Sequence, residues 1–358
     1  MTNEERKKFW ETLCSLPGED AGKELTQLNN SIIVPPAIYR YRKSADEKTI
    51  QALETNRMFF STADHYDDPF DTYINIDYDL IQAQIDAGVS NPDGFISMFK
   101  ERWNSTGLPF PSDNMLEEFK KRVFENIESY KQGFFQFLKH EVQVAFQQRI
   151  WSVCFCESPL NQSMWIKYGA ESHGFCLMYS LKESDMNKLK CGSDPICEQC
   201  TVKHYGLELF PVYYSREKYD ATSTAFEIVQ GYTQCLIKGI HPLSIKDVAL
   251  WWDFSRWSLE KCALIKSIDH EHDEEWRLLF TGHTTNRIQC EWVPSAVILG
   301  LRMSDVERGK VKAAAKKAGI PKCYSVIINW KNELELKEDL DFESFISTEP
   351  EDALCSQN

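Results

Sequence analysis

The stretch Trp151–Tyr179 decides the fold: WSVCFCESPLNQSMWIKYGAESHGFCLMY. Large apolar residues alternate with small ones over residues 151–156, and none of them is charged. This pattern predicts a buried strand. Pro159 ends it, because proline has no amide hydrogen to donate to a neighbouring strand. Asn161 then caps a short helix, and Phe175–Tyr179 predicts a second buried strand.

Two buried strands joined by a short aromatic helix form a rigid platform with polar side chains at its turns. These polar residues are Glu157, Ser158, Asn161 and His173. Functional sites are commonly built in this way, with rigid elements below and polar groups at the turns. The helix residues Trp165 and Tyr168 either line such a site or belong to the core.

The composition is that of a globular protein rich in aromatic residues. The chain has 358 residues, a formal charge of −14, and 10 Trp, 14 Tyr and 21 Phe. A broad nucleic-acid footprint needs a basic surface, so this charge argues against one, although a local basic cleft stays open. No apolar run would span a bilayer, and the start MTNEERKKFWETL is too charged for a signal peptide. We therefore expect a cytoplasmic protein with no membrane partner, whose 12 cysteines are mostly reduced.

Strands come in pairs and helices are bunched, which favours an α+β fold with one mixed central sheet over a doubly wound parallel one. Further strands are predicted at 38–43, 57–62, 273–280, 292–301 and 323–329. The expected organisation is an N-terminal helical extension (1–37), a single α+β domain (38–330) with a helical insertion (77–150) and a Cys/His-containing insertion (181–211), and an acidic C-terminal tail (331–358).

Two capping boxes predict where helices begin. Ser44 is followed three residues later by Glu47, and Ser304 by Glu307. We expect helices after each of them, and we expect residues 338–358 to be frayed.

A first candidate site combines YRYR, residues 39–42, with Phe60, Ser61 and Thr62. Arginine offers a planar fork of donors and a hydroxyl offers short hydrogen bonds, so the pair of strands can hold a phosphate or a ribose. The alternative is an exposed strand edge whose arginines are salt-bridged.

Two further groups are acidic. Asp67, Asp68 and Asp71 lie in the turn DDPFD and either bind a hard metal or form a solvated turn. Asp273, Glu275 and Arg277 alternate along one predicted strand, so a buried face would need partners for them. These residues either form an internal ion pair or supply a carboxylate that stabilises positive charge on a sugar ring.

A fourth group is a cysteine- and histidine-rich insertion. Its candidate zinc ligands are Cys191, Cys197, Cys200 and His204. Four such ligands in a short loop can hold a structural zinc ion, which would close an insertion too short to bury its own core.

The chain resembles a widespread, mostly bacterial family, the domain-of-unknown-function family numbered 2971. YRYR, MFFS, DDPFD, CFCES, MWIKYG, HGFCLMY, EEWRLLF and VPSAVILGLRMS occur in that family's order over residues 38–330. The chain departs from its pattern at Asp67, where the family usually has Asn, and at Asp273, where it usually has Glu. The Cys191–His204 insertion and the long helical segment lie outside the resemblance.

The same order of strands has a looser likeness to the three-part signature of ADP-ribosyltransferases. That likeness implies an ADP-ribosyltransferase-like fold in which Arg40 or Arg42 holds NAD and Ser61 backs the nicotinamide ribose. It implies that Glu275 binds a ribose hydroxyl and stabilises an oxocarbenium-like transition state, with Asp273 as the upstream acid. The implied NAD-binding set also contains Tyr39, Tyr41, Phe60, Asp68, Trp165 and Tyr168, and the implied catalytic group contains Arg277.

Three functional hypotheses follow. The first is an NAD-consuming ADP-ribosyltransferase or glycohydrolase, a toxin or phage-defence effector whose acceptor is a macromolecule and whose partner is an antitoxin or regulatory protein. The second is a non-catalytic ligand- or partner-sensing module of a defence or stress system. The third is a metal-dependent nuclease built from Asp67, Asp68, Asp71 and Glu275.

Overall fold

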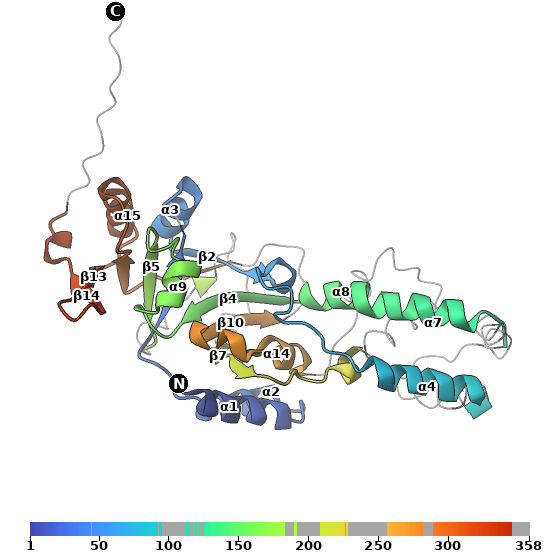
Figure 1. Ribbon diagram of the computed structural model, residues 1–358. Helices are drawn as coiled ribbons and strands as arrows, with labels where there is room; N and C mark the ends of the chain where they lie inside the picture. Colours follow the sequence, from blue (N-terminus) through green and yellow to red (C-terminus); the bar gives the residue numbers. More distant parts are fainter. Residues whose placement is uncertain are drawn as a thin grey trace, which may run out of the picture.

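A computed structural model gives the fold of the chain (Figure 1). It describes residues 1–43, 45–91, 125–182, 190–191, 208–225, 227, 256–281 and 289–345, together with scattered positions between 93 and 121. Within these ranges no helix is both long and apolar enough to cross a membrane.

A mixed sheet of nine strands, counted over the described residues, forms the centre of the molecule. Its order is β14 (Leu334–Glu338), β13 (Cys323–Ile328), β12 (Ala296–Leu299), β5 (Phe175–Ser180), β1 (Ala37–Arg42), β4 (Ile150–Cys156), β10 (Glu275–Thr281) and β7 (Leu209–Pro211), with β3 (Ser61–Thr62) paired to β4. β12 and β13 are parallel, and the other neighbours are antiparallel. The predicted α+β fold with a mixed sheet is confirmed.

Smaller sheets and helices surround this centre. One small sheet contains β2 (Arg57–Phe59), β11 (Gln289–Glu291) and β6 (Lys190–Cys191), and another contains β8 (Tyr213–Ser215) and β9 (Ile265–Ser267). The α-helices are α1 (Asn3–Ser15), α2 (Ala21–Asn30), α3 (Glu47–Glu54), α4 (Tyr78–Ser90), α7 (Ile127–Gln136), α8 (Gln143–Gln147), α9 (Gln162–Lys167), α14 (Ser258–Ala263) and α15 (Asp305–Lys317). The short turns are η1 (Ala63–His65), η2 (Phe137–Val142), η3 (Ile268–Asp273) and η4 (Leu340–Phe342).

The central sheet has two covered faces. On one, which we call the α3 face, Phe155 and Leu177 belong to a core that also contains Leu53 of α3 and Val311 of α15. Figure 1 shows α3 and α15 side by side there. On the other, the α1 face, the ring of Phe9 in α1 stacks on Phe210 of β7 with centroids 5.4 Å apart. Every side chain of the sheet therefore belongs to one of two distinct layers.

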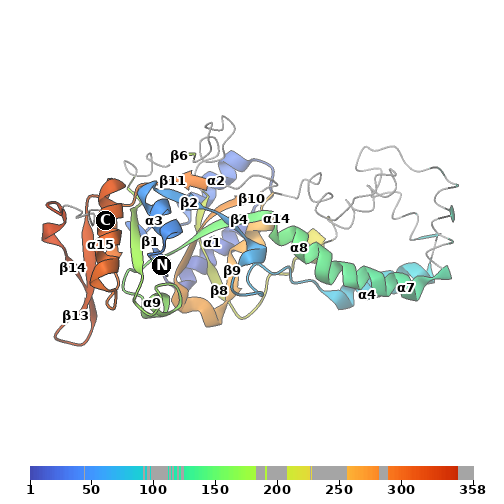
Figure 2. The ribbon, with the colours of Figure 1, turned by 90° about the horizontal axis from the view of Figure 1, so that it is seen from above.

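The helical insertion forms an arm that points away from the sheet (Figures 1 and 2). Its helices α4 and α7 run side by side, since the rings of Tyr78 and Phe135 lie 6.0 Å apart and Lys131 Nζ lies 2.6 Å from Asp86 Oδ1. The predicted helical content of this segment is confirmed where the structure describes it.

Several local predictions are confirmed and others are wrong. Asn161 Oδ1 accepts from the amide of Met164 at the start of α9, and the Ser304–Glu307 capping box opens α15. At α3, however, the cap is Asp46, whose side chain accepts from the amide of Thr49. The predicted Ser44 cap is therefore wrong.

Two strands begin or end elsewhere than predicted. β10 starts at Glu275 rather than at residue 273, because Glu274 has a left-handed backbone with φ of 46° and Asp273 ends the turn η3. In the predicted acidic tail, β14 pairs with β13 along the sheet edge, and Phe342 is 2% exposed. Phe342 thus anchors this segment to the core, so the fraying expected for residues 338–358 is wrong for residues 338–345, and residues 346–358 lie outside the described residues.

The turn before β5 requires glycine at residue 174. Three successive residues, Ala170, Glu171 and Ser172, have φ of 49°, 53° and 70°. A Cβ atom placed on Gly174 would lie 2.0 Å from the carbonyl oxygen of Arg42. The close approach of the two backbones connects the AESHG turn to the end of β1.

Candidate functional site

A buried charge cluster lies on the α1 face at the start of β10. Its members, each 1–9% exposed, are Asp71, Lys266, Asp273, Glu275 and Arg277. Arg277 Nη2 donates to Asp71 Oδ2 at 2.6 Å, and Arg277 Nε donates to Glu275 Oε1 at 2.7 Å. Lys266 Nζ lies 3.3 Å from Asp71 Oδ2, 3.4 Å from Asp273 Oδ2 and 3.2 Å from Glu275 Oε2. The predicted group Asp273, Glu275 and Arg277 is thus brought together.

The charges in this cluster satisfy one another. Burial by itself would raise the pKa of Glu275, but Arg277 and Lys266 outweigh burial and hold that pKa well below 4.5. Lys167 of α9 adds a contact of 2.8 Å to Asp273 Oδ1. The sequence left two alternatives for this strand, an internal ion pair or a carboxylate that stabilises positive charge on a sugar ring. The contacts match the internal ion pair.

Solvent reaches the sheet next to Glu275. Cys154 is exposed although its strand, β4, lies between β1 and β10. It is paired with Arg277 across the strands, so both side chains are on the α1 face. Neighbouring protein atoms displace water around the thiol and raise the pKa of Cys154 to about 12, with a further contribution from Glu275. The thiol is therefore protonated near neutral pH, and the exposed surface has no ready nucleophile.

On the α3 face, arginines line a hollow of about 200 Å³, which we call the arginine cavity. Arg40 and Arg42 come from β1, Arg57 from β2, Ser61 from β3 and Thr49 from α3. The remaining lining residues are Ala52, Leu53, Asn56, Phe59, Phe175, Leu177, Tyr179 and Pro294. The predicted pair Arg40 and Arg42 is therefore brought together, with Arg57 as an addition that the sequence did not suggest. Ser61 borders the cavity, but it is paired with Ser152, two residues from Cys154, so its side chain lies on the α1 face.

The guanidinium groups of this cavity have few partners. The side chain of Arg40 makes no hydrogen bond or ion pair with the residues that the structure describes, and Arg42 Nη2 has only a 3.5 Å contact to Thr49 Oγ1. Arg57 Nε lies 3.7 Å from Glu291 on the surface. Burial, and then the charge of Arg40, lower the pKa of Arg42 to about 10. The charge of Arg40 thus opposes that of Arg42, and Asp46 offsets this only in part, since no carboxylate is among the described residues that line the cavity.

The arginine cavity and the charge cluster lie on opposite faces of the sheet. Tyr39 of β1 and Glu275 of β10 are both paired with Cys156 of β4, so these side chains share the α1 face. Successive side chains of a strand point to opposite faces, which places Arg40 and Arg42 on the α3 face. In the implied transferase signature, Arg40 or Arg42 is the first part and Glu275 is the third. The structure thus places these two parts on opposite faces of the sheet.

The aromatic residues predicted around NAD belong mainly to the core. Trp165 is 1% exposed, donates from Nε1 to the carbonyl oxygen of Pro159 at 2.9 Å, and meets the ring of Tyr41 edge-on at 5.0 Å. Phe60 is 5% exposed within the α3-face core. Tyr39, by contrast, is only half-buried and packs beside Tyr41.

Tyr168 lies at the edge of the charge cluster. Burial raises its pKa to about 12, while Lys266 opposes the rise and Glu275 adds to it. Lys43 Nζ lies 5.7 Å from the centre of the Tyr168 ring. Tyr168 is thus the aromatic residue of the predicted NAD set that lies near Glu275.

The three acids of the DDPFD turn go to different places. Asp71 belongs to the charge cluster, Asp68 Oδ2 lies 3.3 Å from His270 Nε2, and Asp67 Oδ2 lies 3.9 Å from Lys43 Nζ on the surface. Within the described ranges, no group of three or more His, Cys, Asp or Glu residues is placed to hold a metal ion. Because Lys266 and Arg277 already neutralise Asp71 and Glu275, the arrangement does not favour the nuclease hypothesis.

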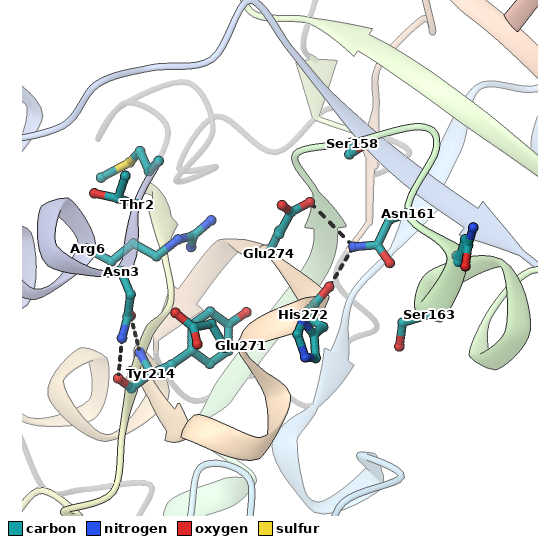
Figure 3. A pocket seen from close by; sticks show the side chains of 12 residues that line it. Thr2, Asn3, Arg6, Ser158, Asn161, Ser163, Tyr214, Glu271, His272 and Glu274 are labelled. Atoms are coloured by element: carbon teal, nitrogen blue, oxygen red, sulfur yellow. Dashed lines mark hydrogen bonds between the residues drawn. The ribbon is translucent and has the colours of Figure 1, made fainter. Parts of the chain in front are cut away.

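A second hollow, of about 520 Å³, lies where α9, the start of α1 and the turn before β10 meet (Figure 3). Ser158 and Asn161, two of the predicted turn residues, line it. Asn161 Nδ2 donates to Glu274 Oε2 at 3.4 Å and to the carbonyl oxygen of His272 at 2.5 Å. The left-handed backbone at Glu274 turns this acid toward the hollow, whereas strand alternation had placed it on the apolar face.

The fold and these sites define an α+β protein with a buried charge cluster on one face of its sheet and a basic cavity on the other. Comparison with protein-family models, with curated proteins and with solved structures found no match. The likeness to the domain-of-unknown-function family stays a prediction based on the sequence motifs. For the predicted zinc group, Cys191 is placed in the backbone of β6, and Cys197, Cys200 and His204 lie outside the described residues.

Proposed function

We propose that this protein binds a phosphate-bearing small molecule in the arginine cavity, as a ligand-sensing module of a defence or stress system. The observation that carries the proposal is the pairing of Arg40 and Arg42, two side chains directed into one cavity without a carboxylate partner there. NAD, which carries a pyrophosphate, is one candidate ligand.

An anion in the cavity would relieve a cost that the folded chain carries. Burial and the charge of Arg40 disfavour the charged form of Arg42 by more than the opposite charge of Asp46 favours it, so the pKa of Arg42 is lowered. A phosphate accepts charge-assisted hydrogen bonds from a guanidinium fork, and each bond to a charged group contributes about 1.5–3 kcal/mol. Thr49 adds a hydroxyl donor at the wall.

The cavity favours binding over cleavage of a glycosidic bond. Breaking the bond between nicotinamide and ribose needs a carboxylate next to the sugar ring to stabilise positive charge. None lines the arginine cavity among the described residues, and Glu275 lies on the other face of the sheet. A ligand held by Arg40 and Arg42 is therefore expected to be bound and released unchanged.

The experiment is a thermal unfolding series in sodium phosphate and in sodium chloride of equal ionic strength. It compares wild type with Arg40→Gln, Arg42→Gln and the matched control Arg216→Gln, which removes an exposed arginine that does not line the cavity. A ligand present at a hundred times its Kd raises the unfolding free energy of a protein with one binding site by about 2.7 kcal/mol. For phosphate this corresponds to an increase of several degrees in the melting temperature. We expect this stabilisation in wild type and Arg216→Gln and its loss in the other two. Equal responses in all four proteins would overturn the proposal.

A second candidate is NAD consumption on the α1 face with Glu275 as the acid, and the exposure of Cys154 beside Glu275 is the observation that favours it. It requires Glu275 to leave Arg277 and Lys266 when substrate binds. Purified wild type and Glu275→Gln would be incubated with NAD, and nicotinamide release would be measured. Release by wild type alone, with both proteins folded, supports this candidate, whereas no release by wild type excludes it.

A further inference from the structure

The size of the arginine cavity restricts its ligand. Its volume is about 200 Å³, below the roughly 300–1,000 Å³ of pockets that enclose drug-sized molecules. A dinucleotide such as NAD exceeds that size. The cavity can instead enclose a phosphate group together with a body about as large as one pentose.

The side-chain donors of the cavity come from two neighbouring parts of the fold, β1 and α3. Arg40 and Arg42 are alternate residues of β1, so their Cα atoms lie roughly 7 Å apart on one face of the sheet. Thr49 reaches the same space from α3, and its Oγ1 lies 3.5 Å from Arg42 Nη2. Two neighbouring guanidinium forks with a hydroxyl beside them match a terminal phosphate, which presents three free oxygens, better than a diester, which presents two.

The charge balance leads to the same ligand class. A phosphomonoester carries nearly two negative charges at pH 7, because its second pKa is about 6. Arg40 and Arg42 supply two positive charges, and no carboxylate is among the described lining residues, although the charge of Asp46 acts on Arg42 from outside the cavity. Arg57, by contrast, is near Glu291. A phosphodiester carries a single charge and would leave one guanidinium without a counter-ion.

The remaining wall accommodates carbon rather than further charge. Phe59, Leu177 and Pro294 are apolar lining residues, and Leu177 lies directly beside Arg40, with which it is paired across β5 and β1. The carbon atoms of a sugar ring can pack against such a surface, which adds affinity through the burial of apolar area. Inorganic phosphate alone would leave this surface uncovered.

We infer that the arginine cavity recognises a small phosphomonoester of about pentose size, with its terminal phosphate on Arg40 and Arg42. This inference rests on the proposed function and narrows it. It also predicts that intact NAD, whose phosphates are both internal, is a poor ligand.

Calorimetric titration at constant ionic strength tests the inference with four probes: ribose 5-phosphate, methyl phosphate, dimethyl phosphate and NAD. We expect ribose 5-phosphate to bind most tightly, methyl phosphate to bind measurably, and the two ligands without a terminal phosphate to bind at least tenfold more weakly than ribose 5-phosphate. Arg40→Gln and Arg42→Gln should each weaken ribose 5-phosphate at least tenfold, while Arg216→Gln leaves it unchanged. The unfolding midpoint of each variant is measured first to show that it is folded.

The outcomes separate the two levels of the proposal. If dimethyl phosphate or NAD binds as tightly as ribose 5-phosphate, and the arginine variants weaken both, the phosphomonoester inference is wrong and the phosphate-binding proposal stands. If none of the four probes binds wild type, both are wrong. If ribose 5-phosphate binds equally well to wild type and to both arginine variants, the site is elsewhere and both are wrong.

Discussion

Arg40 and Glu275 lie on opposite faces of the central sheet, although only β4 separates their strands. The shared pairing of Tyr39 and Glu275 with Cys156 fixes this relationship, because side chains alternate along each strand. One small ligand therefore cannot contact both groups through the sheet. The basic cavity and the buried acid are two separate features, and each leads to its own tests.

Glu275→Ala is expected to destabilise the protein by roughly 1.5–3 kcal/mol, because Arg277 and Lys266 each lose a buried carboxylate contact while Asp71 still pairs with both. Guanidinium chloride unfolding at pH 7 measures this change. The matched control is Glu271→Ala, since Glu271 is an exposed acid four residues earlier on the surface turn. A Glu275→Ala variant as stable as the control would show that the charge cluster is not a structural element.

The charge cluster also predicts an acid limb of stability. The folded-state pKa of Glu275 lies below its ordinary value of 4.5, so its contribution is complete above pH 4.5 and is lost as the pH falls further. The difference in unfolding free energy between wild type and Glu275→Gln should therefore shrink between about pH 4.5 and pH 3. A difference that stays constant over this interval would contradict the assigned ion pairs.

The pKa of Glu208 is shifted in the opposite direction to that of Glu275. Burial, and then the carboxylate of Glu260, raise the pKa of Glu208 to about 7, although Arg256 Nη2 donates to its Oε1 at 3.1 Å. The unfolded chain ionises this group near pH 4.5 and the folded chain near pH 7, so folding becomes less favourable as the pH rises through that interval. Glu208→Gln should thus gain about 1–3 kcal/mol on wild type between pH 4.5 and pH 7.5. Chemical unfolding at both pH values checks it, and a parallel pH dependence of the two proteins would disprove it.

Gly174→Ala should prevent or strongly impair folding. The added methyl group would lie 2.0 Å from the carbonyl oxygen of Arg42, a backbone atom that cannot move without displacing β1. Gly133→Ala in α7 is the matched control, because nothing lies within 4 Å of its Cβ position and alanine is the better helix former by about 1 kcal/mol. Circular dichroism melts of both variants decide the matter, and equal melting temperatures would contradict the close backbone approach at Gly174.

Local chemistry made much of the fold predictable. The uncharged alternation of residues 151–156 predicts β4, the Asn161 side chain caps α9, and the Ser304–Glu307 pair opens α15. These features depend on a few neighbouring residues, so one sequence suffices to recognise them. The same applies to Arg40 and Arg42, whose alternation places both side chains on one face of β1.

Long-range contacts made the rest unpredictable. Asp71 contacts Arg277 across 206 residues, and Lys266 joins them from β9, whose strand pattern is short and weak. The alternation of side chains also does not reveal that Glu274 has a left-handed backbone. This conformation removes Asp273 from the strand, while the carboxylate of Asp273 remains in the charge cluster. β14 was missed because the charged segment LELKE lies at a sheet edge, where one strand neighbour suffices.

A crystal structure of the protein soaked in sodium selenate tests the central claim most directly. Selenate is a tetrahedral dianion like phosphate, and its anomalous scattering locates it without ambiguity. We predict a selenate ion in hydrogen-bond contact with both Arg40 and Arg42, and no ion at that place in crystals of Arg40→Gln. A wild-type crystal in which the cavity holds no anion, and in which carboxylates neutralise both arginines instead, would contradict the account.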